Sequence, residues 1–180
     1  MKLEQTDPLV VRPTRKLWMA AIKPPMYSVA VMPIVVGSAV AYYQARTLNF
    51  PIFFTFLLSA VLILAWENLS NDVFDSETGV DVHKANSLVN LTGNKPLIFW
   101  IGNLCLLLGL LGIGAIAFWQ QDLTVIALIL LCCGLGYVYQ GPPFRLSYQG
   151  VGEILCFFAF GPLAFAAVYY SQTQSWSVVS

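Results

Sequence analysis

The chain has very little charge. Only 10% of its 180 residues are charged, whereas 58% are hydrophobic. A soluble domain of this length carries roughly 25% charged residues, because its surface must face water. This composition therefore excludes an ordinary soluble protein and predicts a polytopic membrane protein in contact with the lipid bilayer.

The chain also lacks a net charge, a second histidine and a C-x-x-C pair of cysteines. The nine basic and nine acidic residues give no net charge, which excludes a basic surface for a nucleic-acid partner. His83 is the one histidine, so a site with several histidine ligands is also excluded. The four cysteines all lie in apolar runs and form no C-x-x-C pair, which is typical of buried structural thiols.

The apolar residues are arranged in about five runs, each near the ~20 residues that a helix needs to cross hydrocarbon. These runs cover residues 18–43, 51–68, 96–119, 123–139 and 153–170. They lack the alternation of a β-barrel, so the predicted fold is all-α, a transmembrane helical bundle. We expect residues 1–16 to form an exposed N-terminal arm and residues 17–180 to form the membrane domain.

The basic residues predict the orientation in the membrane. If the spans alternate, one side of the bilayer receives nearly all of them, whereas the other side receives only Arg46. Because positive loops stay inside, the N-terminus and the loops after the second and fourth spans are predicted to be cytoplasmic, in a plasma, inner or thylakoid-type membrane. The basic residues on that side are Lys2, Arg12, Arg15, Lys16, Lys23, Lys84, Lys95 and Arg145.

The most informative segment follows the second span, where five acidic residues and two asparagines lie within residues 67–81. If the helix continues, Asn68, Asp72 and Asp75 share one face, and Asn71 lies one turn before Asp75. Carboxylate and amide oxygens are the ligands that Mg²⁺ prefers, and Asp81 could fold back after the turn at Gly79. We therefore predict that these five residues bind Mg²⁺, and through it a diphosphate.

Further candidates for substrate binding lie on the same side of the membrane. Lys84 is the cation nearest to the acidic segment, and Lys23 either binds the anion or extends to the surface. Tyr139 opens a second polar segment, residues 139–153, in which Arg145 could bind a phosphate in bidentate fashion. Glu153 either contacts substrate or caps the fifth helix.

Together these segments resemble the UbiA-type intramembrane prenyltransferases. Their N-D-x-x-D motif matches residues 71–75, and the ending Gly79-Val80-Asp81 resembles that of the naphthoate branch. Lys23-Pro24 is similar to an Arg-Pro pair in relatives, and residues 141–148 also resemble members of that branch. The resemblance implies a fold of about nine membrane helices, of which this chain has about five. The second aspartate-rich motif is absent, so we expect the N-terminal part of a longer enzyme.

The resemblance also implies an activity, the transfer of a phytyl or polyprenyl group from its diphosphate to a naphthoate-type acceptor, with Mg²⁺ as cofactor and loss of carboxylate as CO₂. Asn68, Asp72 and Asp75 would carry the catalysis, and quinone biosynthesis would be the setting. Three alternatives stay open at this point. They are a different aromatic acceptor, a transporter that uses the same carboxylates, and a membrane fragment without catalytic activity.

Overall fold

The computed structural model describes residues 14–78 and 86–176, which form helices and no strand. The α-helices are α1 (Arg15–Ile22), α2 (Ser28–Ala45), α3 (Phe50–Thr78), α4 (Leu88–Thr92), α5 (Lys95–Gln120), α6 (Thr124–Gln140), α7 (Gly152–Phe158) and α8 (Ala164–Thr173). Short 3₁₀ turns occupy Pro24–Tyr27 and Leu146–Gln149, and a π-helical turn at Ala159–Leu163 joins α7 to α8. The predicted all-α class is confirmed.

Four of these helical segments are long and apolar enough to cross a membrane. They are Arg15–Ala45, Phe50–Thr78, Lys95–Gln120 and Gly152–Thr173, and α6 adds a shorter apolar helix of 17 residues. Each of the five predicted spans corresponds to one of these five segments. Beyond the predicted second span the helix continues, as the grouping of the acidic residues on one face required, because α3 runs on to Thr78.

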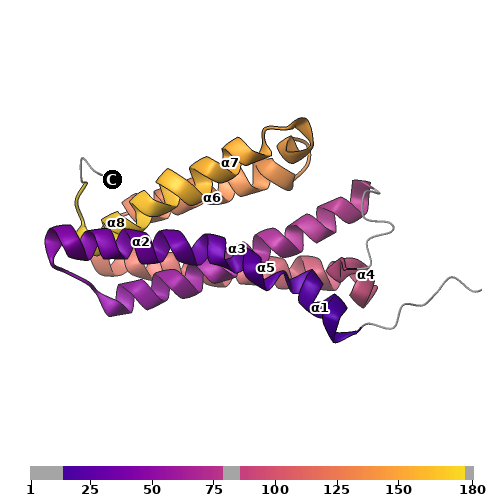
Figure 1. Cartoon of the computed structure of the whole chain (residues 1–180), viewed down its shortest axis with the longest axis horizontal. Helices are drawn as coiled ribbons and strands as arrows, with labels where there is room; N and C mark the ends of the chain where they lie inside the picture. The colour runs from indigo at the N-terminus through magenta and orange to yellow at the C-terminus, as the bar shows by residue number, and fades with distance from the viewer. Residues whose placement is uncertain (1–13, 79–85, 177–180) are drawn as a thin grey trace, which may run out of the picture.

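The helices converge at one end of the molecule and diverge at the other. Figure 1 shows α6 and α7 side by side, with α3 and α5 packed together below them. At one end α8 lies against α2 and α6, whereas toward the end that holds α1 and α4 the α6–α7 pair separates from α3. The space between them is where the candidate site lies.

The pair α3 and α5 has the most extensive contact in the fold. Glycines on α5 allow it, since a Cβ at Gly109 would lie 2.8 Å from Ile63 Cγ1 and 2.9 Å from the Ser59 carbonyl oxygen. Small residues at such positions let helix backbones approach closely in membranes, where packing replaces the hydrophobic effect as the driving force. Ile113 and Ile116, also on α5, are fully buried in the adjoining core.

Hydrogen bonds between polar groups hold the helices together at the end where they converge. The Tyr170 hydroxyl donates to Asp122 Oδ2 at 2.5 Å, and Gln120 Nε2 donates to the Ser171 carbonyl at 2.5 Å. The hydrogen bond from Tyr170, with two further bonds from Thr124, lowers the pKa of the Asp122 carboxyl. These bonds fasten α8 to the α5–α6 turn, so the helices can separate only at the opposite end.

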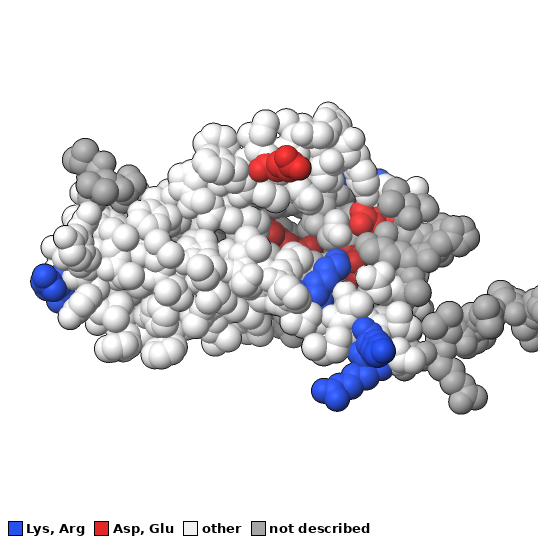
Figure 2. Space-filling model, in the orientation of Figure 1, with Lys and Arg blue, Asp and Glu red and all other residues white. Residues whose placement is uncertain are grey.

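The length of α3 explains why its acidic residues lie at a membrane surface. At 1.5 Å per residue its 29 residues span about 43 Å, well beyond the ~30 Å hydrocarbon core. The last turns therefore extend into the polar region. Figure 2 agrees, since the charged side chains visible on this face gather mostly at the end that holds α1 and α4, and the long middle of the molecule is almost uncharged.

The close approach of α3 and α5 predicts a difference between two glycines. Gly109→Ala is expected to lower the free energy of unfolding by about 1–3 kcal/mol, because the new methyl group meets the backbone of α3. Gly114→Ala on the same helix is the control, since a Cβ there meets nothing within 4 Å. Thermal unfolding in detergent measures both, and equal melting temperatures would contradict the packing described here.

Candidate active site

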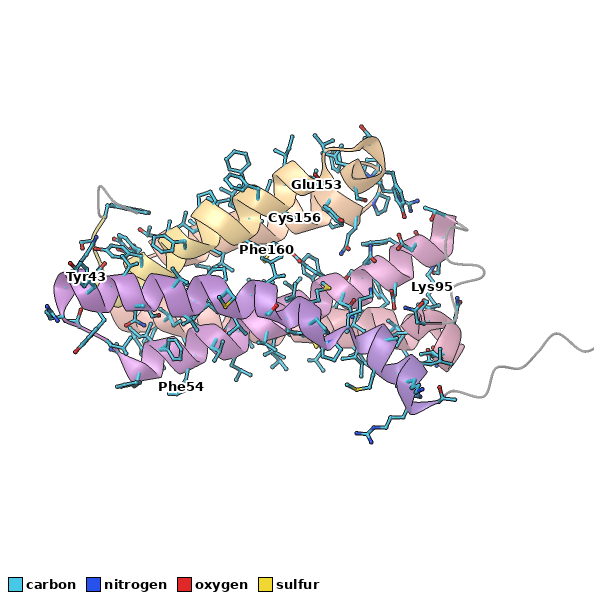
Figure 3. The ribbon with its side chains drawn as sticks, in the orientation of Figure 1. Tyr43, Phe54, Lys95, Glu153, Cys156 and Phe160 are labelled. Carbon is cyan, nitrogen blue, oxygen red and sulfur yellow. The ribbon has the colours of Figure 1, made fainter. Side chains whose placement is uncertain are left out.

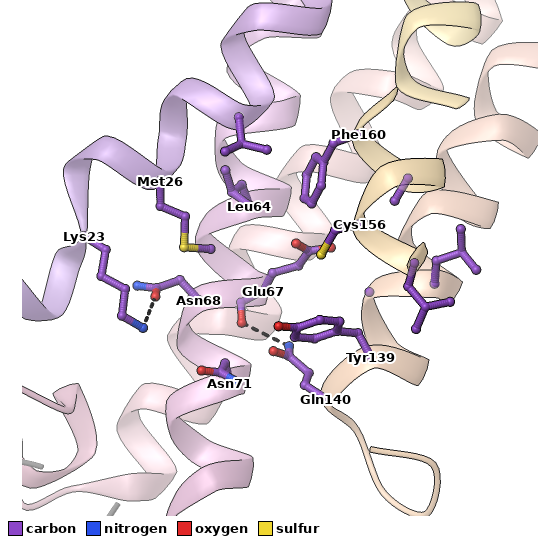
Figure 4. A pocket seen from close by; sticks show the side chains of 15 residues that line it. Lys23, Met26, Leu64, Glu67, Asn68, Asn71, Tyr139, Gln140, Cys156 and Phe160 are labelled. Carbon is purple, nitrogen blue, oxygen red and sulfur yellow. Dashed lines mark hydrogen bonds between the residues drawn. The ribbon is translucent and has the colours of Figure 1, made fainter. Parts of the chain in front are cut away.

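A cavity of about 370 Å³ lies between the diverging helices, and Figure 4 shows the side chains that line it. The lining comes from three walls: Lys23, Met26 and Val29 before and within α2; Leu64, Glu67, Asn68 and Asn71 on α3; and Leu135, Gly136, Tyr139, Gln140, Leu155, Cys156, Ala159 and Phe160 from α6 and α7 onward. Cavities of this size hold small-molecule ligands. Most of the lining is apolar, with polar groups concentrated on α3.

The polar groups of α3 face the cavity because of their helical spacing. Leu64, Glu67, Asn68 and Asn71 lie at positions i, i+3, i+4 and i+7, which share one face of an α-helix. The sequence analysis named the two asparagines as site residues but not Glu67. The signal was available, since Glu67 lies four residues before Asn71.

Lys23 enters the site from a break in the first membrane segment. It ends α1 in the left-handed conformation, and Pro24 follows it directly. Its Nζ donates to Asn68 Oδ1 at 2.8 Å and lies 3.5 Å from Asp72 Oδ1. The Asn68 amide in turn donates to the Ala21 carbonyl at 3.3 Å. The predicted alternative, in which Lys23 extends to the surface, is wrong, because its ammonium contacts Asn68 and Asp72 of α3.

Asp72 is fully buried and is not among the residues that line the cavity. Its Oδ2 accepts a hydrogen bond from the Leu88 amide at 2.7 Å, which holds the start of α4 against α3. Val73, Leu88 and Ala21 pack in a small apolar cluster around this point. Asp72 therefore joins three elements through one carboxylate, in addition to any contact with a ligand.

Asp75 and Glu77 lie in the last turn of α3, outside the lining of the cavity, and bind the loop between α6 and α7. The Tyr148 hydroxyl donates to Asp75, and partial burial followed by this hydrogen bond raises the pKa of Tyr148. Glu77 accepts from Lys95 Nζ at 2.8 Å and from an Arg145 guanidinium nitrogen at 3.3 Å. No site role was predicted for Tyr148 or Glu77, because the pairs of Tyr148 with Asp75 and of Arg145 with Glu77 join segments about 70 residues apart.

Of the remaining predicted site residues, one lines the cavity, one does not, and two lie outside the described residues. Tyr139 lines the cavity, and its neighbour Gln140 donates to the Glu67 carbonyl at 3.0 Å. Glu153 lies exposed in the first turn of α7 and is not part of the lining (Figure 3). Asp81 and Lys84 lie outside the described residues.

The donor atoms fit a cation. Within residues 14–78 and 86–176 no three histidine, cysteine or acidic side chains come together as a metal cluster. However, the oxygens of Asn68 and Asp72 converge on the Lys23 ammonium, which shows that they are oriented toward a positive charge. Asn71 and Asp75 lie one turn apart beside them and supply the hard oxygen donors that suit Mg²⁺.

Chemically, the cavity has two unlike parts. The Lys23 ammonium suits an anionic group, whereas Leu64, Phe160 and the other apolar side chains suit a hydrocarbon or ring that must stay dry. A ligand with a charged head and an apolar body matches both parts.

The chain is similar to several curated proteins that are named as phytyl- or prenyltransferases. The chain is 62% identical over 164 residues to the 2-carboxy-1,4-naphthoquinone phytyltransferase of Synechocystis, which covers 91% of this chain and 53% of that protein. It is 46% identical over 157 residues to the chloroplastic protein of the same name from Arabidopsis thaliana, with 87% and 41% covered. A 1,4-dihydroxy-2-naphthoate octaprenyltransferase of Bacillus subtilis is 23% identical over 178 residues, with 94% and 55% covered.

The chain thus spans about half the length of the curated relatives it matches. Together with the four long apolar helices, this likeness shows an integral membrane protein. Residues 30–180 match the UbiA prenyltransferase family, and the chain therefore belongs to that family.

Proposed function

We propose that the protein transfers a phytyl or related prenyl group from its diphosphate to a naphthoate-type acceptor, with Mg²⁺ as cofactor and loss of CO₂. One observation carries the proposal: Lys23, Asn68 and Asn71, the first residue of the N-D-x-x-D segment, are polar lining residues of a mostly apolar cavity. The names of the two similar phytyltransferases support the phytyl group, and the name of the similar Bacillus subtilis protein supports a dihydroxynaphthoate acceptor. This chain supplies the first acidic motif and three walls of the cavity.

The diphosphate is expected beside Lys23. Lys23 is held in place by Asn68 and Asp72, so its ammonium is already oriented when an anion arrives. Arg145 forms an ion pair with Glu77, and its planar guanidinium can also donate hydrogen bonds to a phosphate. Both cations would stabilise the charge that develops on the leaving diphosphate.

Asn71 and Asp75 would hold the magnesium ion, with Asn68 and Asp72 beside them. When bound, the ion supplies positive charge that neutralises the diphosphate as the allylic C–O bond breaks. Tyr148 donates to Asp75 and thereby fixes the direction of its carboxylate. The fold thus orients the predicted ligands through a phenol, a lysine and a backbone amide.

The apolar walls would protect the reacting carbon. Breaking the allylic C–O bond leaves the electron pair on the diphosphate and a resonance-stabilised cation, which water would destroy. Met26, Leu64 and Phe160 line the cavity and exclude water from it. The electron-rich ring then forms the new C–C bond, and the ring recovers its electrons when the carboxylate carbon leaves as CO₂.

The charge distribution supports an orientation. Arg15, Lys16, Lys23, Lys95 and Arg145 belong to elements at the end with α1, α4 and the α6–α7 loop, whereas Arg46 follows α2 at the other end. By the positive-inside rule we propose that the mouth of the cavity faces the cytoplasm or its equivalent.

The two aspartates of the motif are expected to differ when each is changed in the complete protein. Asp75→Asn should lower the transfer rate about 100-fold or more while the melting temperature stays near the wild-type value, because Asp75 would hold the magnesium ion and lies in the last turn of α3. Asp72→Asn should lower both, because its buried carboxylate joins α3 to Lys23 and to Leu88. Product formation and thermal unfolding measure the two effects.

Asp122→Asn is the matched control, since Asp122 lies in the α5–α6 turn at the far end of the molecule; the asparagine keeps one of the two oxygens that accept from Tyr170 and Thr124, so the melting temperature should fall slightly. The substitution should leave turnover unchanged. Wild-type turnover in Asp75→Asn would refute the proposed role of the motif.

Removal of divalent cations tests the function as a whole. With phytyl diphosphate and 1,4-dihydroxy-2-naphthoate as substrates, a chelator should abolish diphosphate release, and added Mg²⁺ should restore it. Full turnover in the chelator would disprove the proposed metal dependence. Cation transport into liposomes without diphosphate release would instead favour a transporter.

A further inference from the structure

Glu67 carries a carboxylate inside the cavity, in the middle of the membrane segment Phe50–Thr78. Its backbone carbonyl accepts from Gln140, but its carboxylate has no hydrogen bond or ion pair with any of the described residues. In Figure 4 the side chain points toward Cys156 and Phe160, away from Lys23. It therefore lies outside the network that surrounds the diphosphate end.

The position of the Glu67 carboxylate is energetically unfavourable. An ionisable side chain within a membrane segment is expensive and normally has a partner or a function. Glu67 is half-buried and lines the cavity, so its carboxylate is accessible to a ligand there, and no described residue competes for it.

The facing helix leaves room for this carboxylate. A Cβ at Gly136 of α6 would clash with Glu67 Oε1, closer than real Cβ atoms come to a neighbouring atom. At Gly134, two residues earlier, a Cβ would meet nothing within 4 Å. The space beside Glu67 thus depends on the glycine at 136 in particular.

The chemistry of the missing partner follows from the charge. A diphosphate or a ring carboxylate is anionic and would be repelled by Glu67. A hydroxyl can donate to it, and bonds to ionised acceptors are roughly twice as strong as neutral ones. Phe160 and Leu64 supply flat and apolar surface beside it for the ring that bears the hydroxyl.

We propose that Glu67 binds the acceptor, by accepting a hydrogen bond from a hydroxyl of its aromatic ring. This inference rests on the function proposed above. It places the acceptor ring on the α6–α7 side of the cavity and the diphosphate on the Lys23 side. Repulsion between the two carboxylates would turn the ring's own carboxylate away from Glu67. The residue would thereby select hydroxylated rings and set their orientation.

Binding measurements on the complete protein test this without catalysis. Glu67→Leu removes the acceptor atoms and should weaken binding of 1,4-dihydroxy-2-naphthoate about 10- to 100-fold, whereas Glu67→Gln keeps a neutral oxygen and should lie between. The wild type should reject the methyl ethers of this compound, and Glu67→Leu should bind ether and parent compound alike. Affinity for phytyl diphosphate should change less than about 2-fold.

Two glycine variants provide a second test that keeps Glu67 itself. Gly136→Ala should displace the carboxylate and weaken binding of the acceptor, and Gly134→Ala on the same helix should leave it unchanged. Unchanged acceptor binding in Glu67→Leu would overturn the inference, as would a loss of phytyl diphosphate binding in its place. If the wild type binds no phytyl diphosphate, the proposed function itself fails, and this inference fails with it.

Discussion

The site depends on one buried interaction, the contact of the Lys23 ammonium with Asn68 and Asp72. It joins the break between α1 and α2 to the polar turns of α3, and the second oxygen of Asp72 extends the joint to α4 through Leu88. Asp72 is fully buried, so loss of the Lys23 ammonium would remove a positive charge that compensates its carboxylate. The same contact that holds the first wall of the cavity in place also presents a cation to it.

The rest of the cavity follows from the way the helices are fastened. Hydrogen bonds of Tyr170 and Gln120 close one end, and the glycine-rich contact of α3 with α5 fixes the centre. The helices diverge only toward the end where α3 leaves the hydrocarbon. Apolar walls and a polar mouth are thus consequences of helix length and packing, and this polarity is what a prenyl diphosphate requires.

Much of this could be predicted from the sequence, because it depends on local pattern. The apolar runs predicted five helical spans, and the spacing of Asn68, Asp72 and Asp75 predicted one polar face on α3, from which Asn68 lines the cavity. Contacts between distant segments could not be predicted. The pairing of Tyr148 with Asp75 depends on how the α6–α7 loop folds back, and the cavity position of Glu67 depends on the glycine opposite it. The roles of the predicted ligands stay predictions.

The most direct test of the central claim is an experimental structure of the complete protein with Mg²⁺ and a non-hydrolysable phytyl thiodiphosphate. The expected result is a diphosphate within hydrogen-bonding distance of Lys23, with the metal ion between it and the N-D-x-x-D segment and the phytyl chain along the apolar walls. A diphosphate bound away from Lys23 and Asp75, with this cavity empty, would contradict the claim.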